Sequence, residues 1–275
     1  MDLMESYDLK GVFFVDPMPA LVYGSAIVAD MVSPIVERGH EVQIHMHTEW
    51  LEFTKKNPVG GRLGRNIKDY PLNAQIELIG LARDLLCDAG APNPNAFRAG
   101  NYGANDDTLR ALKTLGIAYD SSFNPAYLGS GCDMSFPAHQ NCLTEKHGVK
   151  ELPIAAIRET GSRLRHAQVC ALSSWEMKAA LDHAVYAGLP HFVAITHSFE
   201  FLSRNRKGLN SAVRARFESL CRHVSQQPLL TDGGFHNWPQ ISDAKSEQQF
   251  ERLPPVLIRR LARIGQQAIA RLVAE

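Results

Sequence analysis

The chain has 275 residues, of which 45% are hydrophobic, and it carries 29 basic and 29 acidic side chains. This size supports one large domain or two small ones with a well-buried core. A formal net charge of zero argues against broad electrostatic binding to nucleic acid or to an anionic membrane. No apolar run reaches the roughly 20 residues that a bilayer-spanning helix needs.

The first ten residues are acidic and lack an apolar core, so we expect no signal peptide and a cytoplasmic location. The five cysteines are scattered, odd in number and form no CxxC pair. We therefore expect buried, reduced thiols rather than disulfides or a thiolate zinc site.

Short apolar runs alternate with segments of helical periodicity along most of the chain. The predicted strands are 11–15, 41–45, 97–99, 117–119, 151–154 and 191–197. The predicted helices cover 27–36, 76–86 and 177–184, and Ser173 and Glu176 form a capping-box pattern before the last of them. Strands that alternate with helices predict βα units and a parallel sheet, either open or closed into a barrel.

Two other regions complete the expected organisation. We interpret 126–148 as a long loop, because it is rich in Gly, Cys, Pro and His and has no clean period. We predict that 254–275 forms an amphipathic helix with four arginines that packs on the protein, with a partner or a membrane surface as the alternative. The expected domains are 1–240, and 241–275 with its terminal helix.

The densest group of potential metal ligands lies in 39–50. His45 and His47 share a face if extended geometry continues, and Glu49 follows where the strand gives way to a loop. Imidazole and carboxylate ligands at a strand end suit a divalent metal such as zinc. Surface or core histidines are the alternative reading.

Two further strand ends carry candidate functional residues. Arg98 faces a pocket or forms a structural salt bridge. His197 ends the strongest predicted strand and is a candidate general acid, because an imidazole pKa lies near neutrality; a structural role is its alternative. Four residues are candidates for substrate binding, and Asp16 has a loop role as its alternative. They are Asp16, Trp50, Asn101 and Tyr102.

In this order, the segments resemble the polysaccharide deacetylase superfamily, also called NodB-homology proteins, and in detail its WbmS-type branch. The resemblance runs from about residue 10 to about residue 230 and depends on the order and spacing of six segments. These are 11–15, 39–45, 98–100, 119–122, 151–153 and 196–198.

The resemblance implies a distorted (β/α)7-type barrel that removes an acetyl group from an N-acetylated sugar. The sugar would be nucleotide- or lipid-linked, in bacterial surface-polysaccharide synthesis of the O-antigen (lipopolysaccharide) type. A divalent metal, zinc first, would bind the substrate carbonyl and a water. His197 would protonate the departing amine, and Arg98 would hold the catalytic base or the substrate.

The sequence departs from the family at two places. The family's second metal histidine stands four residues after its first, which is Glu49 here, so we favour His45 with Glu49 as ligands. His47 is then a competing ligand or a neighbour that shapes the pocket.

The family's first motif, an acidic strand end that supplies the base, has no counterpart before residue 11. We interpret the first strand as missing. We therefore expect little or no deacetylase activity, since loss of the base costs roughly 10²–10⁴ in rate. A missing strand would also leave two sheet edges that invite pairing with another chain, here as a homo-oligomer.

Two alternatives belong to other functional classes. One is a non-catalytic sugar-binding or assembly protein on the same scaffold, and the other is a hydrolase of a non-sugar amide. Metal titration separates the first alternative from a deacetylase, and a substrate screen separates the second, because a fold does not determine its substrate.

Overall fold

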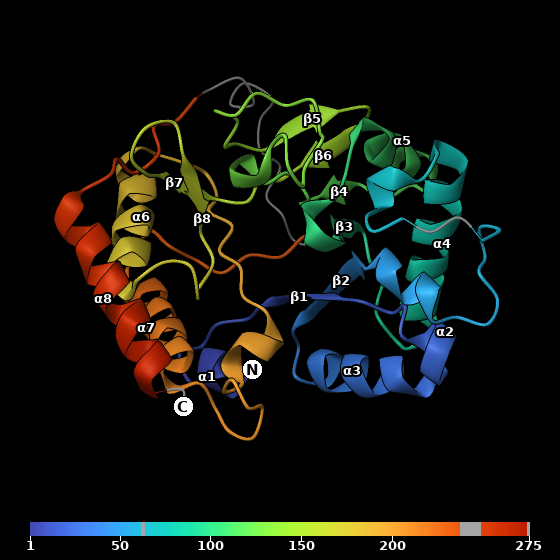
Figure 1. Ribbon diagram of the computed structural model, residues 1–275, viewed down its shortest axis with the longest axis horizontal. Helices are drawn as coiled ribbons and strands as arrows, with labels where there is room; N and C mark the ends of the chain where they lie inside the picture. Colours follow the sequence, from blue (N-terminus) through green and yellow to red (C-terminus); the bar gives the residue numbers. More distant parts are fainter. Residues whose placement is uncertain (62–63, 237–248, 274–275) are drawn as a thin grey trace. The chain divides into compact units, whose positions relative to one another are not determined.

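The computed structural model describes residues 1–61, 64–236 and 249–273 (Figure 1). The chain divides into two compact units. The first comprises residue 1, residues 10–153 and residues 233–248, and the second comprises residues 2–9, 154–232 and 249–275. Each unit is described by itself below. The single domain expected over 1–240 stays a prediction.

A six-stranded sheet with the order β1-β2-β3-β4-β6-β5 forms the centre of the first unit. Its strands are β1 (Val12–Val15), β2 (Glu41–Met46), β3 (Ala96–Ala99), β4 (Tyr119–Asp120), β5 (Thr144–Lys146) and β6 (Val149–Glu151). β1, β2, β3, β4 and β6 are parallel, and β5 pairs antiparallel with β6. The predicted parallel sheet is confirmed, and its strand ends meet at one edge.

Helices connect these strands. The α-helices of the first unit are α2 (Ala20–Tyr23), α3 (Ala26–Glu37), α4 (Leu72–Asp88) and α5 (Asp106–Thr114). Four short 3-10 helices accompany them: η1 (Thr48–Glu52), η2 (Ile67–Asp69), η3 (Gly100–Tyr102) and η4 (Pro125–Tyr127). The helices expected at 27–36 and 76–86 are therefore present, and α3 continues through Pro34 to Glu37.

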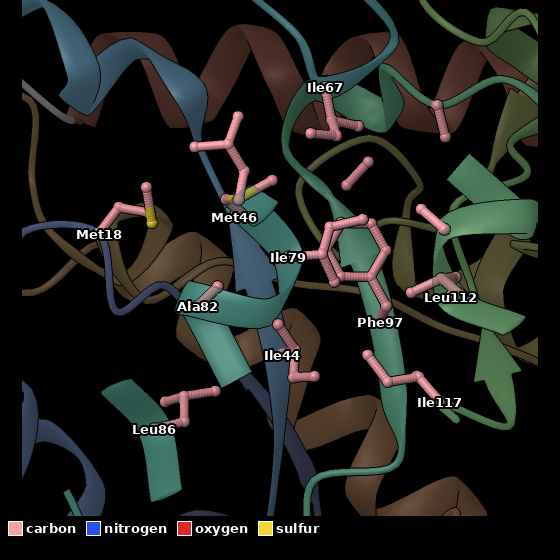
Figure 2. Packing of buried hydrophobic residues seen from close by; sticks show 14 of the residues in the cluster. Met18, Ile44, Met46, Ile67, Ile79, Ala82, Leu86, Phe97, Leu112 and Ile117 are labelled. Carbon is pink, nitrogen blue, oxygen red and sulfur yellow. The ribbon is translucent and has the colours of Figure 1, made fainter. Parts of the chain in front are cut away.

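The core of the first unit lies between the sheet and these helices. Figure 2 shows Ile44 of β2 and Phe97 of β3 with Ile79 of α4 and Leu112 of α5, and all four side chains are fully buried. Burying such a side chain contributes about 1.5–3 kcal/mol. The apolar faces of these elements thus hold the strand ends of the sheet in place.

The second unit combines a hairpin with three longer helices. Its elements are α1 (Asp2–Glu5), β7 (Ala156–Arg158), β8 (Leu164–His166), α6 (Ser174–Tyr186), η5 (Ser198–Phe201), α7 (Ser211–Gln226) and α8 (Leu257–Val273). The predicted capping box is confirmed: the Glu176 amide donates to Ser173 Oγ (3.1 Å), and the Ser173 amide donates to Glu176 Oε2 (2.9 Å).

Two expectations need correction. The strand predicted over 191–197 is wrong as a full strand, because only Ile195 forms a bridge, with Gln168. The segment that lies beside 191–197 turns at Gln168, whose carbonyl oxygen accepts a hydrogen bond from the Leu172 amide. The extended backbone that could pair with 191–197 therefore ends there. The loop predicted over 126–148 contains the end of η4 and all of β5.

Among the residues that the structure describes, the paired strands form an open sheet and a separate hairpin, with no closed ring. The mixed α/β class is thus established, whereas the barrel stays a prediction. Within the same ranges, no helix is both long and apolar enough to cross a bilayer.

Candidate active site at the carboxyl edge of the sheet

The candidate residues of the first unit gather where parallel strands end. Asp16 directly follows β1, His45 lies near the end of β2, and Arg98 lies near the end of β3. His47 follows β2 and caps the start of η1, and Glu49 lies in the first turn of η1. In parallel α/β sheets, this carboxyl edge is the usual location of binding and catalytic groups.

His45 and Arg98 are direct neighbours across the sheet. The two residues pair in register, and His45 Nδ1 lies 2.7 Å from the Arg98 carbonyl oxygen. Because a carbonyl oxygen only accepts hydrogen bonds, Nδ1 carries a proton, and in the neutral ring the lone pair is on Nε2. A histidine fixed in this way by a backbone carbonyl is typical of metal-binding histidines.

Glu49 connects two of the other predicted residues. Its Oε2 lies 3.2 Å from His47 Nδ1, and its Oε1 accepts a hydrogen bond from Asn101 Nδ2 at 2.8 Å. The rings of His45 and His47 meet edge to face, with centroids 4.8 Å apart. The structure therefore brings together His45, His47, Glu49 and Asn101.

The backbone after β3 is unusual at three consecutive residues. A Cβ on Gly100 would lie 2.7 Å from the Met46 carbonyl oxygen and 2.8 Å from His47 Nδ1, so a side chain does not fit there. Asn101 and Tyr102 both have a φ of +56°, in the left-handed region. Such conformations cost on the order of 1–3 kcal/mol each and are found mainly at functional sites.

Asp16 belongs to the same cluster and is held by two donors. Trp50 Nε1 donates to Asp16 Oδ2 at 3.0 Å, and the Met18 amide donates to Asp16 Oδ1 at 3.0 Å. Burial raises the pKa of Asp16 to about 6, against the opposing effects of the Met18 amide, the charge of His47 and Trp50. Asp16 is thus a buried carboxyl group whose pKa approaches neutrality.

Arg98 is engaged on both sides of its guanidinium group. Nε and Nη2 donate to the carbonyl oxygen and the hydroxyl of Ser121 at 3.0 and 2.9 Å, and the group lies 4.0 Å above the Phe14 ring centroid. Burial lowers the pKa of Arg98, while Tyr102, Asp120 and Glu151 act in the opposite direction. These hydrogen bonds therefore fix both the guanidinium group of Arg98 and the backbone at Ser121, directly after β4.

Two buried carboxyl groups, Asp120 and Glu151, lie beside this cluster and were not among the predicted site residues. They pair in register across β4 and β6, and both are fully buried. Asp120 accepts from the Ser122 hydroxyl (2.7 Å) and amide (3.1 Å), and Glu151 Oε1 accepts from the Phe123 amide (3.1 Å).

Burial raises the pKa of both groups, and the charge of Asp120 raises the pKa of Glu151 further, well above its ordinary value. Both shifts favour the protonated form, most strongly for Glu151. The segments 119–122 and 151–153 contained both residues, but no local pattern in either segment indicates that the two carboxyl groups pair.

His197 belongs to the second unit, where it contacts a carboxylate that the sequence analysis missed. His197 Nδ1 lies 2.7 Å from Oε1 of Glu200, whose side chain is 6% exposed. Thr196 Oγ1 donates to Glu200 Oε2 at 3.2 Å, and Gln168 Nε2 also donates to this carboxylate. Although burial raises the pKa of Glu200, the hydrogen bonds from His197 and Gln168 lower it overall.

The remaining predicted site residues, Tyr102 and Trp50, contact other aromatic rings. The Tyr102 ring centroid lies 5.5 Å from that of Tyr127, and the Trp50 ring lies 6.0 Å from the Tyr23 ring. All predicted site residues except His197 thus belong to the first unit and to one edge of its sheet. His197 is grouped instead with Glu200 and Gln168.

The donor set suits a divalent cation by its chemistry, because it combines imidazole nitrogens with carboxylate oxygens. Its arrangement is not preformed: within the described ranges, no three His, Cys, Asp or Glu side chains are grouped so as to hold a metal ion. Glu49 is occupied by His47 and Asn101. A cation would therefore have to replace the His47–Glu49 pair.

No protein-family model matches this chain, and no curated protein matches it. Among solved structures, the chain is similar to a Mycobacterium smegmatis protein described as a "putative polysaccharide deacetylase". The TM-score is 0.57 and the identity 17%, over 93% of this chain and 79% of that one.

The chain is also similar to 4-alpha-glucanotransferase from Thermococcus litoralis, with a TM-score of 0.50 and 12% identity. This similarity covers 93% of this chain and 37% of that one, so the chain spans little more than a third of the transferase. At these identities the likeness concerns the fold. This chain thus has a mixed α/β fold like that of the Mycobacterium smegmatis protein.

Proposed function

We propose that this protein is a carbohydrate deacetylase, a hydrolase that removes the acetyl group from an N-acetylated sugar. The observation that carries the proposal is the meeting of Asp16, His45 and Arg98 at one sheet edge, on a fold similar to the Mycobacterium smegmatis protein. His45 and Arg98 belong to segments that follow the order of the NodB-homology motifs, and Asp16 directly follows the first of these segments.

In the proposed reaction, water attacks the acetyl carbonyl carbon, the C–N bond breaks, and acetate and a free amine result. Asp16 accepts a proton from the attacking water. The Arg98 side chain holds the backbone at Ser121, directly after β4, and the Arg98 carbonyl oxygen accepts a hydrogen bond from His45 Nδ1.

The role of His197 as proton donor to the departing nitrogen is implied by the sequence resemblance and stays a prediction. Glu200 accepts a hydrogen bond from His197 Nδ1, so Nε2 is the ring atom left to face a substrate. The imidazolium form, protonated on both nitrogens, would give its Nε2 proton to the departing nitrogen and regain one from solvent.

A divalent metal, with zinc as the first candidate, is part of this proposal. His45 and Glu49 are the preferred ligands and His47 is the third candidate. When bound, such an ion would polarise the acetyl carbonyl and lower the pKa of a bound water toward ~7. The tautomer of His45 supports this assignment, because its Nε2 carries the lone pair that a metal requires.

The biological setting is the finer part of the proposal. The sugar would be attached to a nucleotide or a lipid carrier, and the reaction would serve surface-polysaccharide synthesis of the O-antigen type in the cytoplasm. Tyr102, Asn101 and Trp50 would contact this sugar.

The test is acetate release from a panel of N-acetylated sugars, compared with small non-sugar amides, with and without added zinc. Release that exceeds the background of an Asp16→Asn variant supports the proposal. Sugar binding by calorimetry without any acetate release would instead indicate a non-catalytic protein. Release from non-sugar amides alone would contradict a carbohydrate substrate.

A further inference from the structure

The helix α8 packs on the second unit through a charged side chain. Arg263, in the middle of the helix, is 4% exposed. Its Nε lies 3.1 Å from Glu176 Oε1, and its Nη2 lies 2.5 Å from Glu159 Oε1. Glu176 is part of α6, beside which α8 lies (Figure 1). Amphipathic helices usually turn their apolar face inward, so α8 has the opposite orientation.

The apolar side of α8 is exposed as a consequence. Leu257 is 70% exposed, Leu261 56% and Ile264 48%, and Ile258 beside them is 61% exposed. Residues spaced by three and four lie on one face of a helix, so these side chains form a continuous stripe over two turns. We call these four residues the α8 stripe.

The ion pairs of Arg263 with Glu159 and Glu176, which belong to other parts of the unit, fix the orientation of α8. Glu176 is held by the capping box with Ser173, and Glu159 also binds Arg165 Nε at 2.8 Å. Although burial raises the pKa of Glu159, its contacts with Arg165 and Arg263 lower it overall. Rolling α8 so that Leu257 turned inward would leave both carboxylates without Arg263. The stripe is therefore held outward by charges that belong to other elements.

The charge of α8 favours one kind of occupant. Residues 257–273 contain four arginines and no aspartate or glutamate, although the net charge of the whole chain is zero. Arg263 is neutralised by its two carboxylates, whereas Arg260 is exposed and Arg259 is partly exposed beside the stripe. An exposed aliphatic stripe beside arginines matches the interface of an anionic bilayer, where apolar side chains enter the acyl boundary and cations meet the headgroups. A second copy docked through the same stripe would find no carboxylate on this helix to pair with the exposed Arg260.

We infer that α8 is an interfacial helix that lays Leu257, Ile258, Leu261 and Ile264 onto an anionic lipid surface. The inference depends on the packing of the second unit and is independent of the proposed deacetylase activity. It also refines the sequence-based expectation, because the overall charge of zero conceals a local basic and apolar surface.

Vesicle co-sedimentation of the full-length protein tests this inference. We expect binding to vesicles of phosphatidylcholine mixed with phosphatidylglycerol, weaker binding to phosphatidylcholine alone, and a decrease with added salt. The triple variant Leu257→Gln, Leu261→Gln, Ile264→Gln should bind at least about tenfold more weakly, because its partition depends on buried apolar area. These side chains are exposed, so the variant should keep the wild-type unfolding transition.

The matched control is Leu209→Gln with Leu229→Gln, which changes two side chains of the same unit that are 67% and 76% exposed. This control should bind vesicles like the wild type. Equal binding by the triple variant, or equal binding to neutral and anionic vesicles, would overturn the inference. A wild-type dimer that the triple variant abolishes, without any vesicle binding, would also overturn it and assign the stripe to self-association.

Discussion

His197 Nδ1 donates a hydrogen bond to Glu200 Oε1 over 2.7 Å, and the two residues are only three positions apart in the chain. A carboxylate oxygen accepts hydrogen bonds, so this contact places the ring proton on Nδ1. The Glu200 side chain is 6% exposed, whereas the His197 side chain is 42% exposed. A buried anchor therefore orients a histidine that solvent and ligands can reach.

The variant Glu200→Gln should disturb the tautomer of His197. A glutamine amide can accept from Nδ1 or donate to it, so nitrogen-detected NMR should show a mixture of tautomers where the wild type shows the proton on Nδ1. Acetate release should fall by roughly 10²-fold or more, as for other histidines that lose an orienting carboxylate. Glu218→Gln, at a more exposed carboxylate in the same unit, should change neither measurement.

An unchanged tautomer in Glu200→Gln would contradict the orienting role, whatever the activity. An altered tautomer with unchanged acetate release would keep the contact and remove His197 from the proposed reaction.

Arg98→Lys should destabilise the protein although the charge is kept. A lysine cannot donate to both Ser121 oxygens in one plane, nor cover the Phe14 ring as a guanidinium does. We expect a loss of about 1–3 kcal/mol in the free energy of unfolding, measured by urea denaturation. Arg110→Lys, at an exposed arginine with a bond to Asp107, should be close to neutral. Equal stability of the two variants would show that the Arg98 contacts contribute little.

Glu151→Gln should make stability less dependent on pH. The pKa of Glu151 is raised well above 4.5 in the folded protein by burial and by Asp120. The stabilising effect of its proton is therefore complete below pH 4.5 and is lost as the pH rises toward the folded pKa, because the unfolded chain releases its proton first.

Urea denaturation between about pH 5 and about pH 8 checks this prediction. The free energy of unfolding should decline with rising pH in the wild type, and the decline should be smaller in Glu151→Gln, since glutamine does not ionise. Glu145→Gln, at an exposed residue of β5, should keep the wild-type dependence. Parallel declines in wild type and Glu151→Gln would contradict the raised pKa of Glu151.

Zinc binding, measured by calorimetry, should depend on the residues after β2. Glu49→Gln removes an anionic ligand and should weaken binding by at least roughly tenfold. His47→Ala should strengthen zinc binding if His47 only competes for Glu49, and it should weaken zinc binding if His47 is a ligand. Glu52→Gln, on the same 3-10 helix, is the control and should bind like the wild type. Equal affinity of Glu49→Gln would remove Glu49 from the ligand set.

Local periodicity was enough to predict the framework of the first unit. The alternation of 41–45 and the helical spacing of 76–86 are properties of short windows, and the structure contains β2 and α4 there. Parallel strands also bring the ends of β2 and β3, with His45 and Arg98, to one edge of the sheet. The place of Asp16 at this edge was less certain from the sequence, where a loop role was its alternative.

The contacts between distant segments could not be predicted in the same way. Asp120 and Glu151 pair only because β4 and β6 are neighbours in register, which depends on the order of strands in the sheet. The segment 191–197 is apolar enough for a strand, but its neighbour turns at Gln168 and leaves one bridge. The side of α8 that packs inward depends on Glu159 and Glu176, far away in sequence, and not on the apolar period of the helix.

The close approach of the backbone at Gly100 limits how this sheet edge can change in evolution. The Met46 carbonyl oxygen and the His47 ring occupy the space where any other residue would carry its first side-chain atom. Even alanine would force the ends of β2 and β3 apart and move the imidazole from its carboxylate. Homologous chains that keep His47 in this position should therefore retain glycine here. Chains that have replaced the glycine should have a different backbone path at the ends of β2 and β3.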